Sequence, residues 1–163
     1  MSEGKTMSQT DAEKKRKFRS AKRMREIMTE YYIDAKTAGQ SGKKVAWITS
    51  GGPVEPLIAM DVIPVYPENY GAMIGAQHMG GDLCAAAGDM GFDDCVCSYA
   101  RSTIASTARG EGPLGALPAP DLLLACNNGC GTMFKWYEVL SRRFGIPLLF
   151  FDTPYCAGEP TPQ

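Results

Sequence analysis

The stretch of residues 121–138 constrains the fold of this chain most strongly, because it has the pattern of a strand, a turn and a helix in succession. Residues 122–125 form a short, continuous apolar run, which is typical of a strand buried on both faces of a parallel sheet. Polar residues, glycines and two cysteines follow at 126–131, and apolar side chains then recur at helical spacing. The two cysteines are therefore expected at the carboxyl end of a strand, where open α/β sheets bind ligands.

The rest of the chain repeats this alternation of strands and helices. It predicts an α/β protein with a flavodoxin-like or Rossmann-like parallel sheet and a long N-terminal helix. With about four strands, fewer than the five or six of an average sheet, the sheet is predicted to be incomplete. We expect a basic helical arm at 1–40 and an α/β domain at 41–163, the N-terminal part of a larger subunit. The expected strands are 44–48, 62–65, 122–125 and 147–151, and the expected helices are 11–38, 53–60, two short ones within 67–91, 99–108 and one that begins near 131.

Basic residues are concentrated in residues 1–44, which hold twelve Lys/Arg against six Asp/Glu, whereas residues 45–163 hold five against twelve. A basic arm can bind nucleic acid. Here, however, the basic residues alternate with apolar ones at helical spacing, which favours the solvated face of an amphipathic helix. We therefore expect no nucleic-acid partner. Because no apolar run approaches the ~20 residues of a membrane span, and no secretory signal pattern is present, we expect a cytoplasmic protein without membrane contact.

Six cysteines in such a chain indicate a reducing compartment, where thiols are free or metal-bound. Cys97 and Cys130 both lie at predicted helix starts, where the helix dipole favours the thiolate that binds metal. Two such thiols at one end of a sheet can hold a soft metal or an iron–sulfur cluster. No pair is spaced as in a zinc ribbon or a ferredoxin. The alternatives are buried free cysteines, or zinc held by Cys95, Cys97, Cys126 and Cys130.

A second candidate site is the turn Ser50-Gly51-Gly52, between a predicted strand and a predicted helix. Backbone N–H groups of such a turn can cradle a phosphate or a thioester oxygen. The turn lacks the spacing of a dinucleotide fingerprint or a Walker loop, so a tight turn without a ligand is the alternative. Glu55, close behind it, is either a general acid or base or a carboxylate that stabilises the start of a helix.

The order of motifs along the chain resembles the 2-hydroxyacyl-CoA dehydratase and benzoyl-CoA reductase family. It is most similar to the cluster-bearing subunits of benzoyl-CoA reductase. The motifs run through most of residues 40–156, and together they are specific. The sequence departs from the family at Pro56 and Asp61, where leucine and glycine are usual. The matching pieces are Pro53–Glu55 with Ala59 and Pro64, Tyr66–Gly71, Cys97–Arg101, Leu117–Asp121, Asn127–Cys130 with Lys135–Glu138, and Ile146–Pro147 with Asp152–Pro154.

The resemblance implies a flavodoxin-like subunit that holds a [4Fe-4S] cluster through three cysteines. Two of them match Cys97 and Cys130, and the family's third comes from a later domain that this chain does not contain. The resemblance also implies a catalytic role for Glu55 near the thioester end of an acyl-CoA. The substrate-binding residues it implies are Ser50, Gly51, Gly52, Tyr99 and Asn128.

The chemistry that the resemblance implies is low-potential electron transfer, in which an ATP-dependent iron–sulfur activator injects one electron. The reductases use it to reduce the aromatic ring of benzoyl-CoA. The dehydratases use it to form a ketyl radical and expel hydroxide from a 2-hydroxyacyl-CoA. We expect an oxygen-sensitive subunit that acts on benzoyl-CoA-type thioesters, paired with a paralogous subunit as a heterodimer, and inactive as a fragment alone. The alternatives are a 2-hydroxyacyl-CoA dehydratase and a non-catalytic or zinc-binding accessory module.

Overall fold

A computed structural model describes residues 18–154 and Gly158 of the 163-residue chain. The predicted start of the first helix, residues 11–17, lies outside the described residues. The chain divides into two compact units between Asp34 and Ala35, and this division falls inside helix α2 (Arg19–Thr37). In the first unit, exposed Glu26 pairs with Lys22 and Arg23 at helical spacing. Within the described part of the chain, no helix is long and apolar enough to cross a membrane.

The second unit is built on an all-parallel sheet of four strands within the described residues, in the order β2-β1-β3-β4. Trp47 in the middle of β1 lies opposite Val65 of β2 and Leu123 of β3. This arrangement confirms the predicted α/β fold with a Rossmann-like or flavodoxin-like parallel sheet. The strands are β1 (Lys44–Ile48), β2 (Val62–Val65), β3 (Leu122–Cys126) and β4 (Leu148–Phe151).

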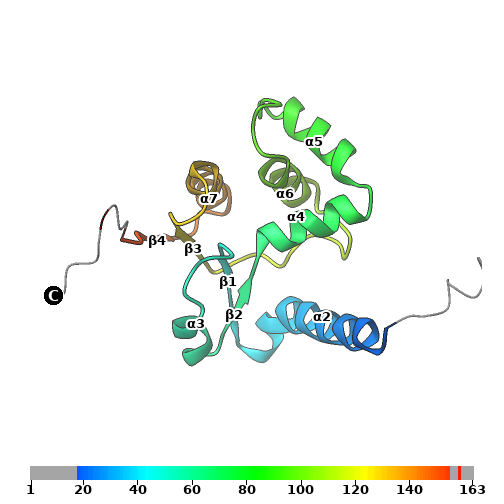
Figure 1. Cartoon of the computed structure of the whole chain (residues 1–163), viewed down its shortest axis with the longest axis vertical. Coiled ribbons are helices and arrows are strands. Elements are labelled where there is room, and N and C mark those ends of the chain that lie inside the picture. The colour runs from blue at the N-terminus through cyan, green and yellow to red at the C-terminus, as the bar shows by residue number, and fades with distance from the viewer. Residues whose placement is uncertain (1–17, 155–157, 159–163) are drawn as a thin grey trace, which may run out of the picture. The chain divides into compact units, whose positions relative to one another are not determined.

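Helices connect the strands, and Figure 1 shows α3 on one side of the sheet and α4, α6 and α7 on the other. The first connection is shorter than predicted, because the expected helix at 53–60 begins only at Glu55. The turn after β1 is closed by a hydrogen bond from Gly52 N to Thr49 O, and the first helical hydrogen bond runs from Ile58 N to Val54 O. The helices of this unit are η1 (Ala38–Ser41), α3 (Glu55–Ala59), α4 (Pro67–Ala76), α5 (Gly80–Asp89), α6 (Ser98–Arg109) and α7 (Gly131–Phe144).

Side chains of the central strands alternate between two apolar layers, as expected for a strand covered on both faces. Ala46, Ile48 and Leu124 form a buried cluster with Leu57 of α3. On the opposite face, the Trp47 ring meets Phe144 of α7 edge to face, with the ring centroids 5.3 Å apart. Both faces of β1 and β3 are therefore filled, and the free chemistry of the sheet lies at the ends of its strands.

The strand order creates a topological switch point between β1 and β3. The chain leaves β1 for β2 on one side of it and later returns to β3 on its other side. In open α/β sheets, ligands bind outside the carboxyl ends of the strands at such a point. Thr49 follows β1 directly and Asn127 follows β3 directly. The topology therefore brings the loops that contain Ser50 and Asn128 to the same edge of the sheet.

Candidate functional site

The loops that follow β1 and β3 are joined by the side chain of Asn128. Its amide nitrogen donates a hydrogen bond to Gly51 O at 3.1 Å, and its Oδ1 accepts one from the Cys126 thiol at 2.9 Å. A Cβ atom on Gly51 would lie 2.6 Å from the Asn128 side chain, so a larger residue there would displace the contact. The structure thus brings together two of the predicted substrate-binding residues, Gly51 and Asn128.

Cys126 lies beneath this contact and is part of the sheet. Its backbone nitrogen donates to Thr49 Oγ1 at 3.1 Å, and its sulfur lies 3.0 Å from the same oxygen. Both side chains are buried. The thiol is therefore engaged in hydrogen bonds that tie the end of β3 to the end of β1.

This position of Cys126 bears on the four-cysteine zinc alternative. Cys95, Cys97 and Cys130 are exposed, whereas Cys126 is buried. Among residues 18–154, no group of three or more His, Cys, Asp or Glu side chains is arranged to hold a metal ion. The described chain therefore does not assemble the zinc set.

Ser50 is held by Glu68, which lies in the first turn of α4. The same carboxylate oxygen, Glu68 Oε2, accepts hydrogen bonds from the Ser50 backbone N–H and from the Ser50 hydroxyl, each at 2.6 Å. Glu68 is buried, and its position in the first turn of a helix stabilises its negative charge. Ser50 itself is exposed. Its hydroxyl oxygen therefore has a fixed orientation at the edge of the sheet.

The backbone of the glycine turn is partly committed to internal hydrogen bonds. Ser50 N donates to Glu68, and Gly52 N donates to Thr49 O at 2.8 Å. A Cβ atom on Gly52 would lie 2.7 Å from the Ile48 side chain. Close packing alone thus requires both glycines. Of the three N–H groups at 50–52, only that of Gly51 has no hydrogen-bond partner within the described residues and remains available to a ligand.

The other two predicted residues of this site lie apart from the Asn128 network. Glu55 is exposed at the start of α3, and its charge contributes, after burial, to raising the pKa of Tyr66, the residue that follows β2. Glu55 therefore lies near the end of β2, one strand away from Ser50. Tyr99 in α6 packs against α4, since a Cβ atom on Gly71 would lie 3.2 Å from it, while 44% of its surface stays exposed.

Cys97 and Cys130 have equivalent positions at two helix N-termini. Each is the residue that precedes its helix, α6 for Cys97 and α7 for Cys130, and each is exposed. An apolar cavity of about 430 Å³ lies between these two helices. Val96, next to Cys97, and Gly131, next to Cys130, both line it. The chain neighbours of the two predicted metal ligands therefore border one cavity.

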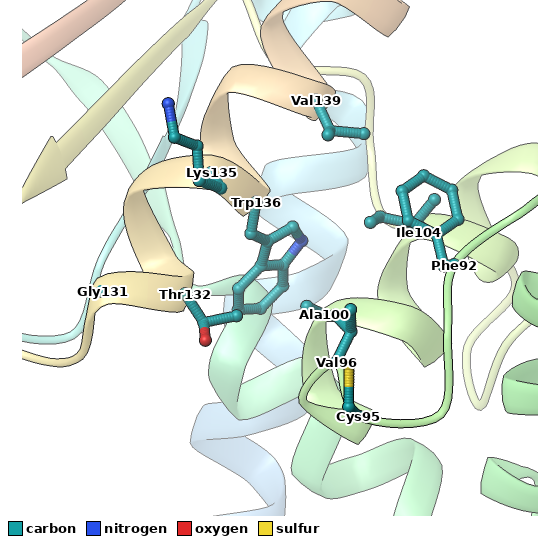
Figure 2. Close-up of a pocket in the computed structure, with 10 residues that line it drawn as sticks. All are labelled: Phe92, Cys95, Val96, Ala100, Ile104, Gly131, Thr132, Lys135, Trp136 and Val139. Carbon is teal, nitrogen blue, oxygen red and sulfur yellow. The ribbon is translucent and has the colours of Figure 1, made fainter.

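The lining of this cavity is mostly apolar, with a few polar groups (Figure 2). Figure 2 shows the Trp136 indole directed from α7 toward Ala100 of α6. Trp136 is buried, and its Nε1 has no hydrogen-bond partner among the described residues. A dry cavity with unused donors suits a ligand that is mainly apolar and has a few acceptors. The full lining is Phe92, Cys95, Val96, Ala100, Ile104, Gly131, Thr132, Lys135, Trp136 and Val139.

The loop before α6 is fixed by Arg101 and Asp93. The buried Arg101 guanidinium donates to Cys84 O at 2.7 Å and pairs with Asp94 at 2.5 Å. Asp93 accepts from Cys95 N at 2.8 Å, and hydrogen bonding to Asp93 raises the pKa of the Cys95 thiol. Cys95 is therefore the less suitable metal ligand of the two cysteines in this loop, since metals bind the thiolate.

Sequence reasoning gave no role to Glu68, Thr49 or Tyr137, which underlie the site. Glu68 was part of a matching motif, and the available signal was a carboxylate in the first turn of the helix after β2. Tyr137 Oη and Glu68 Oε1 are both buried without a hydrogen-bond partner among the described residues. Burial, the Glu68 charge and then Cys126 raise the pKa of Tyr137 well above its usual value. Tyr137 therefore stays protonated beside the Glu68 carboxylate.

Comparison with known families matches this geometry to one of them. The profile of the family described as "2-hydroxyglutaryl-CoA dehydratase, D-component" matches residues 49–163. That range includes the Ser50 turn, Glu68 and both exposed helix-start cysteines, Cys97 and Cys130.

Individual relatives agree with the family match. The chain is 39% identical over 147 residues to the (R)-phenyllactyl-CoA dehydratase alpha subunit of Clostridium sporogenes, covering 90% of this chain and 36% of that protein. It is 37% identical over 130 residues to the (R)-2-hydroxyisocaproyl-CoA dehydratase alpha subunit of Clostridioides difficile (80% and 32%). It is 29% identical over 136 residues to a subunit of the benzoyl-CoA reductase of Thauera aromatica (82% and 32%). The chain thus spans about one third of the length of these curated relatives.

Proposed function

The chain belongs to the 2-hydroxyglutaryl-CoA dehydratase, D-component family, and we propose on this basis that it forms part of a subunit of an iron–sulfur enzyme that acts on acyl-CoA thioesters. The family membership confirms the resemblance seen in the sequence. The observation that best supports the proposal is that the neighbours of Cys97 and Cys130 border one apolar cavity. Soft thiolate ligands beside a dry cavity suit an iron–sulfur cluster and an acyl group.

The proposed reaction is the removal of water from a 2-hydroxyacyl-CoA. Relatives above 30% identity include two dehydratase alpha subunits, those for (R)-phenyllactyl-CoA and (R)-2-hydroxyisocaproyl-CoA. A second candidate is reduction of a benzoyl-CoA-type thioester, the reaction that the sequence motifs favoured first. It is supported by the match to a benzoyl-CoA reductase subunit and by the aromatic lining of the cavity.

Cys97 and Cys130 are the residues proposed to hold a [4Fe-4S] cluster. The donor set fits in part: both thiols are exposed at helix N-termini, while the described chain offers no third ligand beside them. The third cysteine would come from outside the described residues. When bound, such a cluster supplies electrons at low potential.

The chain's own residues would bind and orient the thioester. The Gly51 N–H and the Ser50 hydroxyl oxygen are the exposed groups of the turn, and Asn128 holds that turn in place. Glu55, exposed near the end of β2, would take or give a proton close to the acyl group. Tyr99 would contact the substrate from the start of α6. The cavity between α6 and α7 would exclude water from the acyl chain.

The proposal also includes partners and a location. A paralogous subunit would complete a heterodimer, and an ATP-dependent iron–sulfur activator would supply electrons. We place the protein in the cytoplasm, where free thiols such as the five described cysteines persist.

The reaction can be tested on the protein isolated without oxygen in its natural assembly. With activator and ATP, it should convert (R)-phenyllactyl-CoA into the unsaturated thioester with loss of one water, as followed by mass spectrometry. Glu55→Gln should lower turnover by about 100-fold or more, the usual contribution of a general acid or base. Asp61→Asn, an exposed change on the same side of the sheet, is the control. Ring reduction of benzoyl-CoA without dehydration would favour the second candidate, and conversion of neither would contradict the proposal.

A further inference from the structure

We propose that Glu68 is a positioning residue, which takes the hydroxyl proton of Ser50 in a hydrogen bond so that Ser50 presents an acceptor to the ligand. The inference rests on the proposed function and narrows it. It concerns a buried carboxylate that accepts hydrogen bonds from one exposed serine, and it predicts which acyl-CoA thioesters the site prefers.

Glu68 is tied to Ser50 by two hydrogen bonds that end on one oxygen. Oε2 accepts from Ser50 N and from Ser50 Oγ, each at 2.6 Å. The backbone N–H can only donate, so Oε2 must act as an acceptor there. The hydroxyl bond has the same direction, because the Ser50 proton points to the same oxygen. The proton of the exposed hydroxyl is thereby turned inward, toward the protein.

The surroundings of Glu68 keep this direction fixed. The side chain is 8% exposed and lies in the first turn of the ten-residue helix α4. Its second oxygen, Oε1, is fully buried and has no hydrogen-bond partner among the described residues. Tyr137 Oη nearby is equally buried and unpartnered within that part of the chain, and it stays protonated because burial and the Glu68 charge raise its pKa. No described donor therefore competes with Ser50 for Oε2.

The consequence is a rule for the ligand at this edge of the sheet. A hydroxyl oxygen whose proton is committed retains only its lone pairs for a further partner. Ser50 would therefore bind a ligand group that donates a hydrogen bond, such as the hydroxyl of a 2-hydroxyacyl thioester. A thioester without a donor would leave the Ser50 lone pairs unpaired on binding, which costs affinity. Glu68 thus favours the hydroxylated substrate class over a benzoyl-type thioester.

The test compares two thioesters that differ in one hydroxyl group, phenyllactyl-CoA and 3-phenylpropionyl-CoA. Their binding to the protein in its natural assembly is measured by calorimetry without activator or ATP, so that no turnover is needed. The wild-type protein should bind the hydroxylated thioester about 10-fold more tightly, since one hydrogen bond in a buried site is worth roughly that factor. Glu68→Met removes the acceptor and should reduce this preference to below about 3-fold, while the affinity for 3-phenylpropionyl-CoA is kept.

Three further variants separate positioning from a structural role. Ser50→Ala should abolish the preference, and Glu68→Met should then have no additional effect on it. Glu68→Gln keeps an oxygen acceptor at this position and should retain most of the preference; it also replaces Glu68→Met as the informative variant, with Glu68→Asp, if the methionine variant does not fold. Equal loss of affinity for both thioesters in Glu68→Met would show a structural role only and overturn the proposal.

The outcomes also distinguish this inference from the proposed function. Binding of both thioesters with equal affinity by the wild-type protein would contradict the role of Glu68 and leave the acyl-CoA function intact. Failure to bind either thioester would contradict the proposed function, and the inference with it.

Discussion

Asn128 donates a hydrogen bond to the carbonyl oxygen of Gly51 at 3.1 Å, so a single side chain joins the loops that follow β1 and β3. These loops lie at the switch point of the sheet, and the Asn128 side chain leaves no room for a Cβ atom at Gly51. The shape of the candidate site therefore depends on the absence of a side chain at one position.

We predict that Gly51→Ala destabilises the protein by about 1–3 kcal/mol, the usual cost of forcing an extra methyl group into a packed region. The new Cβ atom would lie 2.6 Å from the Asn128 amide, so the contact must open. Gly75→Ala in α4 is the matched control, because a Cβ atom there meets no atom within 4 Å and alanine favours helices. Urea unfolding measures both, and equal stability of the two variants would contradict the prediction.

Asp121 provides a prediction about pH. Its carboxylate accepts hydrogen bonds from Lys44 Nζ at 2.8 Å and from Val45 N at 2.9 Å, which lower its pKa. A lowered pKa means that the ionised group stabilises the fold above the ordinary aspartate value, near ~4, and that this contribution disappears as the pH falls through the lower pKa of the folded state.

The substitution Asp121→Asn should therefore reduce the free energy of unfolding at neutral pH by about 1 kcal/mol or less, since the side chain is partly exposed and its ion pair is screened. The difference from the wild-type protein should shrink as the pH is lowered below about 4. Urea unfolding at a series of pH values checks this, and a difference that stays constant down to the acid range would count against it.

The fold was predictable because its strands are continuous apolar runs that end in polar turns. The same reasoning placed Ser50 and Asn128 near each other, since parallel strands end at one edge of the sheet. Glu68 was not assigned a role, because its contact with Ser50 joins residues eighteen positions apart through the packing of α4. A carboxylate in a first helical turn is common and does not reveal its partner.

Two other features also required three-dimensional packing. The start of α3 was misplaced because Pro53 suggested a first helical position, whereas the hydrogen bond from Gly52 to Thr49 closes a turn first. The cavity between α6 and α7 depends on how two helices meet, and Trp136, expected in the core, lines it. Periodicity identifies the apolar face of a helix but not the space left between two such faces.

Cys97 and Cys130 should be close enough to be cross-linked in the iron-free protein. Their sulfurs are predicted to lie within about 10 Å, roughly the spacing of packed layers. A bismaleimide of that span should join them, as identified by peptide mass spectrometry, and the product should be absent from Cys97→Ser. Buried Cys126 should not react in the folded protein. Modification of both cysteines by a single maleimide without any cross-link would show that they do not share a site.

The measurement that tests the central claim most directly is the iron and sulfide content of the protein isolated without oxygen in its natural assembly. The account predicts a brown protein with about four irons per cluster-bearing subunit, as a [4Fe-4S] cluster requires. Cys97→Ser and Cys130→Ser should each lose most of that iron, whereas Cys95→Ser should keep it. A colourless, iron-free wild-type protein, or full iron content in both the Cys97 and the Cys130 variants, would contradict the account.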